Sequence, residues 1–257
     1  MDVAQFKREL YQCKGTVYDL DGTLVRGRVA EGVGKRFLKR ELTRIFTDWH
    51  NKGYHARNVK LGATNYSRVN RAAKEKGDPE GLRLFLEILG QARCADQESA
   101  YGFAHDYVQE RALPGAHDFV RFIKYGMRTR RESHPSLVST LGSDIAVEVA
   151  MRYFGLDNGI AAVRVAYNDG FISGGEVEAR NGEEMAHKTE KVLQRYGLSL
   201  NACLVVGNDI NDHPMMSAAR LTAASPLADE VTKAAAHIWI RDYETFLEEL
   251  RKSEVVS

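Results

Sequence analysis

The sequence predicts an α/β fold, a doubly wound parallel sheet with a block of helices inserted after its first strand. From residue 113 onward, short apolar runs alternate with stretches of helical periodicity. An earlier apolar run, GTVYDL at 15–20, is separated from them by about 85 residues that have helical patterning and no clear strand. Strands that alternate with helices form parallel sheets covered on both faces. We therefore expect a core made of residues 1–27 and 113–257 and a helical inserted domain of residues 28–112.

The inserted stretch is predicted to contain four helices. Apolar residues recur on one face from 31 to 51, and the opposite face is basic, which is typical of a solvated helix surface. A weaker helical pattern runs from 65 to 76 and ends at a glycine. The pair Asp78 and Pro79 predicts a helix N-cap followed by proline in the first turn, and Asp96 predicts the cap of the fourth helix.

The remaining sequence supplies the other strands of the predicted sheet. After a helix that ends near residue 126, apolar runs are separated by helical stretches and by one hairpin around NDGFISGG. The last two runs, LTAAS and HIWI, are short, and each precedes a helix. The expected strands are 136–140, 163–167, 202–207, 221–225 and 237–240, and the main helices between them are 144–154 and 184–196.

Composition excludes several classes of protein. The 36 Lys and Arg residues nearly balance the 35 Asp and Glu residues, whereas generic nucleic-acid binders carry a strong basic excess. No run of about 18 apolar residues could span a membrane, and the charged start of the chain has no signal-peptide core. The cysteines, Cys13, Cys94 and Cys203, are odd in number and lack CxxC spacing, which argues against a disulfide framework or a zinc site. We therefore expect a cytoplasmic protein without a nucleic-acid or membrane partner.

Acidic side chains follow two of the predicted strands. Asp19 and Asp21 end the first strand, and Asn208, Asp209 and Asp212 follow the strand CLVVG. In a doubly wound sheet, ligands bind beyond the carboxyl ends of the strands. Clustered carboxylates repel one another unless a cation neutralises them, and oxygen ligands without a nearby cysteine favour Mg²⁺. A plain surface turn is the alternative for DLDGT, because Asp-Gly is a common turn pair.

The stretch DLDGT resembles the first motif of the haloacid dehalogenase superfamily of phosphohydrolases. The resemblance extends over nearly the whole chain and is strongest to the phosphoserine-phosphatase-like branch, in which a helical cap also lies between the first strand and the second motif. It implies a Rossmann-like core with residues 28–112 as the cap domain, and Mg²⁺ as the cofactor.

The resemblance assigns a role to each residue of the first motif. Asp19 matches the nucleophile, which would form an aspartyl-phosphate. Asp21 matches the general acid and base, and its backbone carbonyl would bind Mg²⁺. Gly22, which lets the chain turn, and Thr23, which would brace Asp21, are assigned to the phosphate-binding turn.

The second and third motifs each leave a choice of residue. The phosphate-binding hydroxyl is Ser139 or Thr140, and the spacing of Thr140 from the following DIAV favours Thr140. The phosphate-binding lysine is Lys188 or Lys191, and Lys188 fits better by its place at the start of the predicted helix. A lysine there is unusual on dipole grounds, because helix N-termini favour anions, and a nearby phosphate would explain it.

The fourth motif departs from the pattern of the superfamily. In VVGNDINDHPMM, Asn208 takes the first acidic position, where a metal ligand is expected. An amide oxygen can bind Mg²⁺ but contributes no charge. Asp209, one residue later, would compensate, and Asp212 matches the second acid and would bind the ion or orient its waters. The choice between Asn208 and Asp209 as ligand stays open.

Together these features predict a Mg²⁺-dependent phosphatase that acts on a small phosphorylated metabolite through an aspartyl-phosphate. Two alternatives remain. A phosphotransferase or phosphomutase would share the chemistry, and a non-catalytic protein that binds a phosphorylated ligand would explain Asn208. The helical cap would select the substrate, and neither the substrate nor the oligomeric state follows from the sequence.

Overall fold

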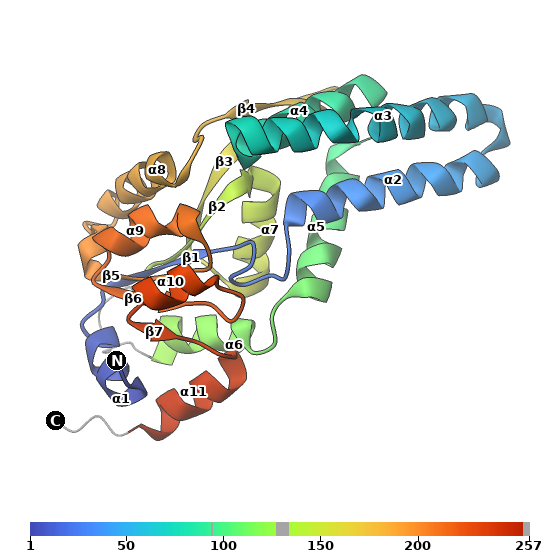
Figure 1. The fold of residues 1–257 in the computed structure, drawn as a ribbon. Helices are drawn as coiled ribbons and strands as arrows, with labels where there is room; N and C mark the ends of the chain where they lie inside the picture. The colour runs from blue at the N-terminus through green and yellow to red at the C-terminus, as the bar shows by residue number, and fades with distance from the viewer. Residues whose placement is uncertain (94, 127–133, 254–257) are drawn as a thin grey trace.

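The computed structural model describes residues 1–93, 95–126 and 134–253. Its core is a seven-stranded sheet in the order β4-β3-β2-β1-β5-β6-β7, with β1 buried at the centre (Figure 1). All neighbouring strands run parallel except β3 and β4, which form an antiparallel hairpin at one edge. The strands are β1 (Gly15–Asp19), β2 (Ser136–Ser143), β3 (Asn158–Asn168), β4 (Phe171–Val177), β5 (Cys203–Gly207), β6 (Leu221–Ala224) and β7 (Ile238–Trp239).

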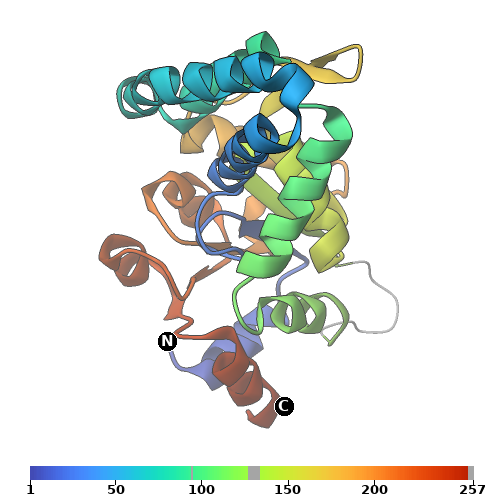
Figure 2. The ribbon, with the colours of Figure 1, turned by 90° about the vertical axis from the view of Figure 1, so that its right-hand side faces the viewer.

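Helices cover both faces of this sheet, which confirms the predicted doubly wound α/β fold. Figure 2 views the sheet from the side and separates the two helical layers. One layer packs on β2, β3, β5 and β6 and contains α8 (Gly182–Gln194), α9 (His213–Ala218) and α10 (Glu230–Ala235). The other contains α7 (Asp144–Phe154), α6 (Ala116–Arg121), α11 (Tyr243–Lys252) and α1 (Val3–Leu10).

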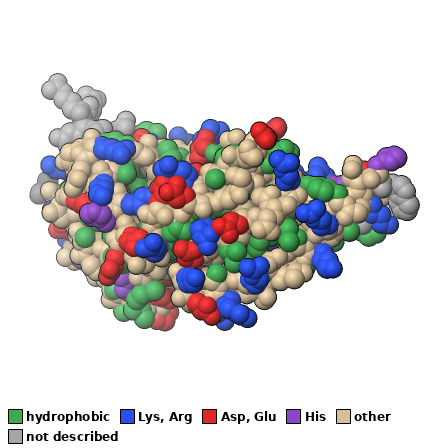
Figure 3. Space-filling model, turned by 90° about the horizontal axis from the view of Figure 1, so that it is seen from above, with side chains coloured by type: hydrophobic (Ala, Val, Ile, Leu, Met, Phe, Trp, Pro, Cys, Tyr) green, Lys and Arg blue, Asp and Glu red, His purple; other side chains and the backbone are tan. Residues whose placement is uncertain are grey.

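Between β1 and β2 the chain forms four long helices that project from the core (Figure 1). Helix α2 packs on α3 and α5, and α4 packs on α3 and on β4. Seen from above, Lys and Arg side chains are scattered among Asp and Glu side chains (Figure 3). No helix in the described part of the chain has the length and apolar character that a membrane crossing requires. The four helices are α2 (Val29–Thr47), α3 (Lys52–Lys76), α4 (Asp78–Ala92) and α5 (Gln97–Arg111), with a 3-10 turn at Trp49–Asn51.

The prediction of four helices in this stretch is confirmed, but one end, one start and one cap were wrong. The first helix was expected to run to 51, whereas α2 ends at Thr47 and a 3-10 turn follows it. Helix α3 begins at Lys52 rather than 65, because its contacts with α2 and α4 stabilise a first half whose own apolar pattern is sparse. Asp78 is not the N-cap of α4. Gly77, at φ 91°, takes that position, and the Asp78 carboxylate instead accepts a hydrogen bond from Arg28 at 2.8 Å.

The N-terminal helix and the cysteines remain to be compared with the expectations from the sequence. Helix α1 was not predicted, because it is short and is fixed by its amphipathic packing on α11 and by the Asp2 carboxylate, which accepts from the Gln5 N–H. Cys13 and Cys203 are buried free thiols. Cys94, the third cysteine of the sequence, lies outside the described residues.

Candidate active site

The predicted acidic residues meet where the order of the strands reverses. The chain builds outward from β1 through β2 to β4, then returns to the other side of β1 with β5. Ligands bind at such a switch point, beyond the carboxyl ends of the strands. Asp19 ends β1, and Asn208 directly follows β5. The site is therefore placed by topology, with its first acid largely buried, since Asp19 is 8% exposed.

A tight turn after β1 holds Asp21. Gly22 has φ 91°, and its N–H donates to the Val25 carbonyl at 2.8 Å. A Cβ on Gly22 would lie 2.4 Å from the Asn208 amide, so both the backbone angle and the close approach require glycine. The turn is fixed from the core side, where the Tyr243 hydroxyl donates to the Thr23 carbonyl at 3.0 Å. The Asp21 carboxylate accepts from the N–H of Val29, which opens α2.

The two candidate hydroxyls at the end of β2 face different partners. Ser139, which pairs in register with Asp19, has its hydroxyl 3.1 Å from that of Thr189 on α8. The Thr140 hydroxyl contacts the Asp21 carboxylate and accepts from the Gly142 N–H at 3.0 Å. Both residues line the same cavity as Asp19 and Asp21. The contact of Thr140 with Asp21 supports the choice of Thr140 as the phosphate donor, which stays a prediction.

The loop after β5 folds around the buried Asp212 carboxylate. This carboxylate accepts from the N–H of Asn208 at 2.7 Å and from that of Asp209 at 3.3 Å. Asp209 in turn accepts from the Asn211 N–H at 2.8 Å. A Cβ on Gly207 would meet Asp212 at 2.6 Å, so glycine lets β5 run directly into this loop. These bonds orient Asp212 within the loop, while Asp209 and Asp212 both line the cavity.

The Asn208 amide lies against Asp19 Oδ2 and the Asp21 carbonyl oxygen, two atoms that could bind a cation. With Nδ2 turned inward it donates to Asp19 Oδ2 at 2.9 Å and to the Asp21 carbonyl at 3.2 Å. With Oδ1 turned inward, the amide oxygen lies 2.9 and 3.2 Å from these two oxygen atoms, and neighbouring ligands of octahedral Mg²⁺ lie about 3 Å apart. No three His, Cys, Asp or Glu side chains in the described residues are arranged to hold a metal. One carboxylate, one backbone carbonyl and one amide oxygen form a set that would suit Mg²⁺.

Burial and mutual repulsion raise the pKa values of the acidic cluster. Burial raises the pKa of Asp19 well above its usual range, and the nearby Asp212 and Asp21 carboxylates raise it further. Burial raises the pKa of Asp21 to about 6, against the opposing effect of the hydrogen bond from the Val29 N–H. Burial also raises the pKa of Asp212 to about 7, although the Asn208 N–H bond lowers it. The site thus stores unfavourable electrostatic free energy that a bound cation would relieve.

These pKa values predict how the stability of the metal-free protein depends on pH. Asp21 and Asp212 titrate near 3.8 when unfolded but at about 6 and about 7 when folded. Between these values the folded state holds more protons, so their contribution to the free energy of unfolding falls as the pH rises from about 4 to 7. Denaturant unfolding with chelator at several pH values measures the fall, which should be smaller in Asp212→Asn than in the wild type. Equal slopes for the two proteins would contradict the prediction.

The structure does not bring Lys188 into this cluster. Its ammonium donates to the Glu178 carboxylate at 2.6 Å and to the Ala161 carbonyl at 3.0 Å. Helix α8 begins at Gly182, earlier than expected, so Lys188 lies in its second turn. Met185, one turn earlier and 2% exposed, lines the cavity instead. The sequence analysis did not predict Met185 at the cavity. It placed Lys188 there because nothing in the local pattern shows that Lys188 pairs with Glu178, which lies just after β4.

Lys188→Ala tests whether the lysine acts on phosphate or only on Glu178. If the ammonium serves the half-buried pair seen here, we expect turnover to fall less than tenfold and stability to fall by about 1 kcal/mol. Glu178→Gln is the matched control and should give the same small changes. The measurements are kcat/KM and Tm for both variants. A loss of about a hundredfold or more in Lys188→Ala, with an unchanged Tm, would place the lysine on the substrate.

The acidic cluster opens into one cavity of about 350 Å³. Its other walls come from α2, α3 and α4, within the stretch that was expected to select the substrate, although the sequence analysis named none of their residues as site residues. Arg28 and Lys35 lie among the lining residues, and each is ion-paired, to Asp78 at 2.8 Å and to Glu31 at 2.5 Å respectively. The apolar lining of the helices includes Phe37, Leu38, Val69, Leu82, Phe85 and Leu89.

Comparison with known proteins finds one matching family and several solved structures of similar fold. The sequence model of haloacid dehalogenase-like hydrolases matches residues 16–217. A phosphoserine phosphatase in apo form is 22% identical, with a TM-score of 0.61 over 92% of this chain and 98% of the other. A substrate-bound phosphoserine phosphatase is 21% identical, with a TM-score of 0.61 over 93% and 98%.

A third solved structure is similar in fold. It is a HAD-family hydrolase from Salmonella enterica serovar Typhi, 16% identical, with a TM-score of 0.66 over 94% of this chain and 73% of the other. No curated protein matches in sequence. The family match spans both acidic motifs and most of the sheet, from β1 to α9. The chain therefore belongs to the haloacid dehalogenase-like hydrolase family.

Proposed function

We propose that this protein is a phosphomonoester hydrolase that works through an aspartyl-phosphate on Asp19. The observation that carries the proposal is the pair of acids at one tight turn, Asp19 and Asp21, both lining one cavity beside the Thr140 hydroxyl. Two carboxyls at a phosphate can divide the work of nucleophile and proton carrier. The fold of phosphoserine phosphatases supports the reaction class.

Each step follows from the placement of these two acids. A carboxylate oxygen of Asp19 attacks phosphorus, an Asp19–phosphorus bond forms, and the bond from phosphorus to the ester oxygen breaks. Asp21 gives its proton to that leaving oxygen. Asp21 then takes a proton from water, whose oxygen attacks phosphorus and frees Asp19 with release of phosphate. A pKa of about 6 lets Asp21 serve in both directions near neutral pH.

The cofactor that fits this site is Mg²⁺. Asp19 Oδ2, the Asp21 carbonyl and Asn208 Oδ1 would hold it, with Asp209 and Asp212 available to its outer ligands. When bound, it supplies positive charge that offsets the acidic cluster and the phosphate oxygens. We further propose that residues 28–112 act as a cap, because α2, α3 and α4 form the walls that enclose the substrate above the acids.

A second candidate is a protein that binds a phosphorylated ligand without turnover. Two observations favour it: Lys188 is engaged by Glu178 outside the cavity, and the first acid of the fourth motif is the neutral Asn208. The first keeps a lysine away from the phosphate, and the second replaces a charged cation ligand with a neutral one, which weakens the binding of Mg²⁺. This candidate predicts saturable binding of phosphate analogues and no phosphate release.

Phosphate release from an aryl phosphate and from a panel of phosphomonoesters tests the proposal. We expect release in Mg²⁺ that stops in chelator and returns when Mg²⁺ is restored. Transfer of the phosphoryl group to an added alcohol, with no free phosphate, would show a phosphotransferase. Binding of phosphate without release, in any divalent cation, would overturn the hydrolase and favour the second candidate.

A further inference from the structure

A phosphate in this site needs a cationic side chain, and Lys188 is held away from it. The ammonium of Lys188 is paired with the Glu178 carboxylate at 2.6 Å. A phosphate dianion that approaches Asp19 and Asp21 meets carboxylates that already repel one another. A positive side chain beside the phosphate would lower the cost of bringing a dianion to this cluster. The question is which side chain of the chain can take that place.

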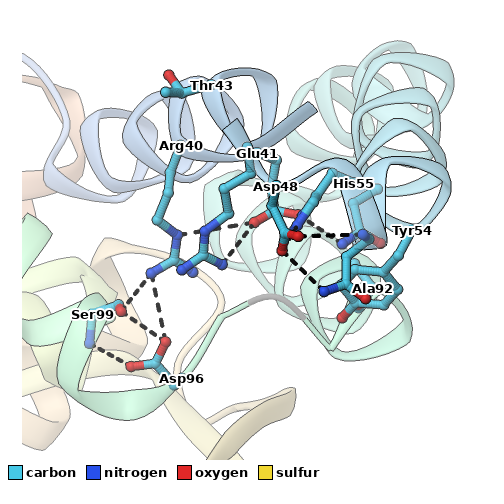
Figure 4. A network of polar contacts seen from close by, with 12 residues as sticks. Arg40, Glu41, Thr43, Asp48, Tyr54, His55, Ala92, Asp96 and Ser99 are labelled. Carbon is cyan, nitrogen blue, oxygen red and sulfur yellow. Dashed lines mark hydrogen bonds and ion pairs between the residues drawn. The ribbon is translucent and has the colours of Figure 1, made fainter. Parts of the chain in front are cut away.

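The basic residues among the described lining of the cavity are Arg28 and Lys35. Arg40, further along α2, is engaged elsewhere. Figure 4 shows its guanidinium directed toward Asp96 and Ser99, with 2.5 Å to the Ser99 hydroxyl. Lys35 lies seven residues beyond Arg28, which is about 10 Å along the helix. Arg28 is therefore the basic lining residue nearest to the acidic turn along the chain.

Arg28 directly precedes α2, at a point where the backbone already contacts the acids. The N–H of Val29, the next residue, donates to Asp21 Oδ1 at 3.0 Å. Burial raises the pKa of Asp21 most, and the Arg28 charge acts in the opposite direction. The N-terminus of α2 also faces Asp21, and the positive end of a helix favours anions. A guanidinium on a flexible side chain attached here can reach a phosphate that Asp21 contacts.

The present partner of Arg28 is easily replaced. Arg28 is paired with Asp78, the first residue of α4, at 2.8 Å, and the two side chains are 59% and 36% exposed. An ion pair so open to solvent contributes little to stability. A phosphate offers the guanidinium two oxygen atoms and a higher charge, in the geometry that arginine binds best. Asp78 also lines the cavity, so Arg28 would exchange partners within it.

We propose that Arg28 binds the phosphoryl group of the substrate, leaving Asp78 as the phosphate enters, and so takes the part that the sequence assigned to Lys188. The exchange would also release the link between the start of α2 and the start of α4. This inference rests on the proposed function for the position of the phosphate, but not on turnover.

The test measures the binding of phosphates without turnover. Calorimetry with Mg²⁺ on Asp19→Asn gives the affinity for inorganic phosphate, for ethyl phosphate and for phosphoglycolate, which also carries a carboxylate. Adding Arg28→Ala should weaken the binding of inorganic phosphate and of ethyl phosphate about tenfold or more, because charge-assisted hydrogen bonds are lost. Arg28→Lys should recover only part of the loss, since lysine keeps the charge but not the planar fork.

The two partners of the ion pair should give effects of opposite sign. Asp78→Asn removes the competitor for Arg28, so the affinity for inorganic phosphate should stay equal or rise up to about fivefold. Lys35→Ala is the matched control, because Lys35 is also an ion-paired basic residue of the cavity wall. It should change the affinity less than about threefold.

Three results would contradict the role of Arg28, with thermal unfolding used to confirm that each variant is folded. They are unchanged binding of inorganic phosphate in Arg28→Ala, equal losses in Arg28→Ala and Asp78→Asn, and a loss confined to phosphoglycolate, which would place Arg28 on a carboxylate. No phosphate binding by the parent Asp19→Asn would overturn the phosphate site and the role of Arg28 together. Binding that depends on Arg28, without phosphate release by the wild type, would overturn the hydrolase alone.

Discussion

Asp19→Asn should reduce phosphate release by about a thousandfold or more, because the neutral amide cannot attack phosphorus. The variant should nevertheless fold. Asn has the same shape as Asp, and its uncharged side chain removes the repulsion that Asp212 and Asp21 exert on the Asp19 carboxylate. Steady-state phosphate release and thermal unfolding in chelator measure the two effects. We expect turnover to vanish while Tm at pH 7 stays equal or rises.

Asp21→Asn tests the proposed role of Asp21 as proton carrier separately from the role of Asp19 as nucleophile. An aryl phosphate has a leaving group that needs no proton, so this variant should still form the aspartyl-phosphate but hydrolyse it slowly. The expected trace is a burst of about one phenolate per protein followed by a much slower phase, and Asp19→Asn should give no burst. A burst in Asp19→Asn, or turnover above about a tenth of the wild-type rate, would show that Asp19 is not the nucleophile.

The elements that position the acids could be predicted from the sequence for a local reason. Strands β1 and β5 are short apolar runs buried at the centre of the sheet, and such runs are visible without knowledge of their neighbours. Asp19 ends β1 and Asn208 directly follows β5, so the topology brings the two together. The turn at Gly22 was also predicted, because a glycine directly after the two acids permits a sharp turn, and in the structure Gly22 has φ 91°.

Other parts of the site depend on partners that local patterns do not reveal. Lys188 was expected at the phosphate because it lies near a helix start, yet Glu178, ten residues earlier, binds its ammonium. The cavity above the acids depends on how α2, α3 and α4 pack against one another. Asn58 belongs to no motif. Its buried amide donates to Glu41, which lies seventeen residues earlier on another helix, so its position cannot be read from local sequence. Packing, rather than propensity, determines these features.

Asn208→Asp should have opposite effects on the metal-free and the Mg²⁺-bound protein. Without cation, the variant loses the hydrogen bonds from the Asn208 amide to Asp19 Oδ2 and to the Asp21 carbonyl, and it adds a carboxylate to a buried acidic cluster. Its Tm in chelator should therefore fall. With cation, the added carboxylate supplies a charged ligand in place of a neutral one. The affinity for Mg²⁺ should rise about tenfold or more, because ligand charge sets the affinity of such oxygen sites.

Calorimetric titration with Mg²⁺ and the increase of Tm on adding Mg²⁺ report both effects without any substrate. Asn211→Asp is the matched control, since it adds the same charge to the same loop, and Asn211 also lines the cavity. It should change the Mg²⁺ affinity less than Asn208→Asp does. Wild-type Asn208 would then be a ligand that turns its oxygen to the cation and its nitrogen to Asp19 when the cation leaves. Equal responses in the two variants would mean that Asn208 does not contact the ion, and Asp209 would become the residue to test as its ligand.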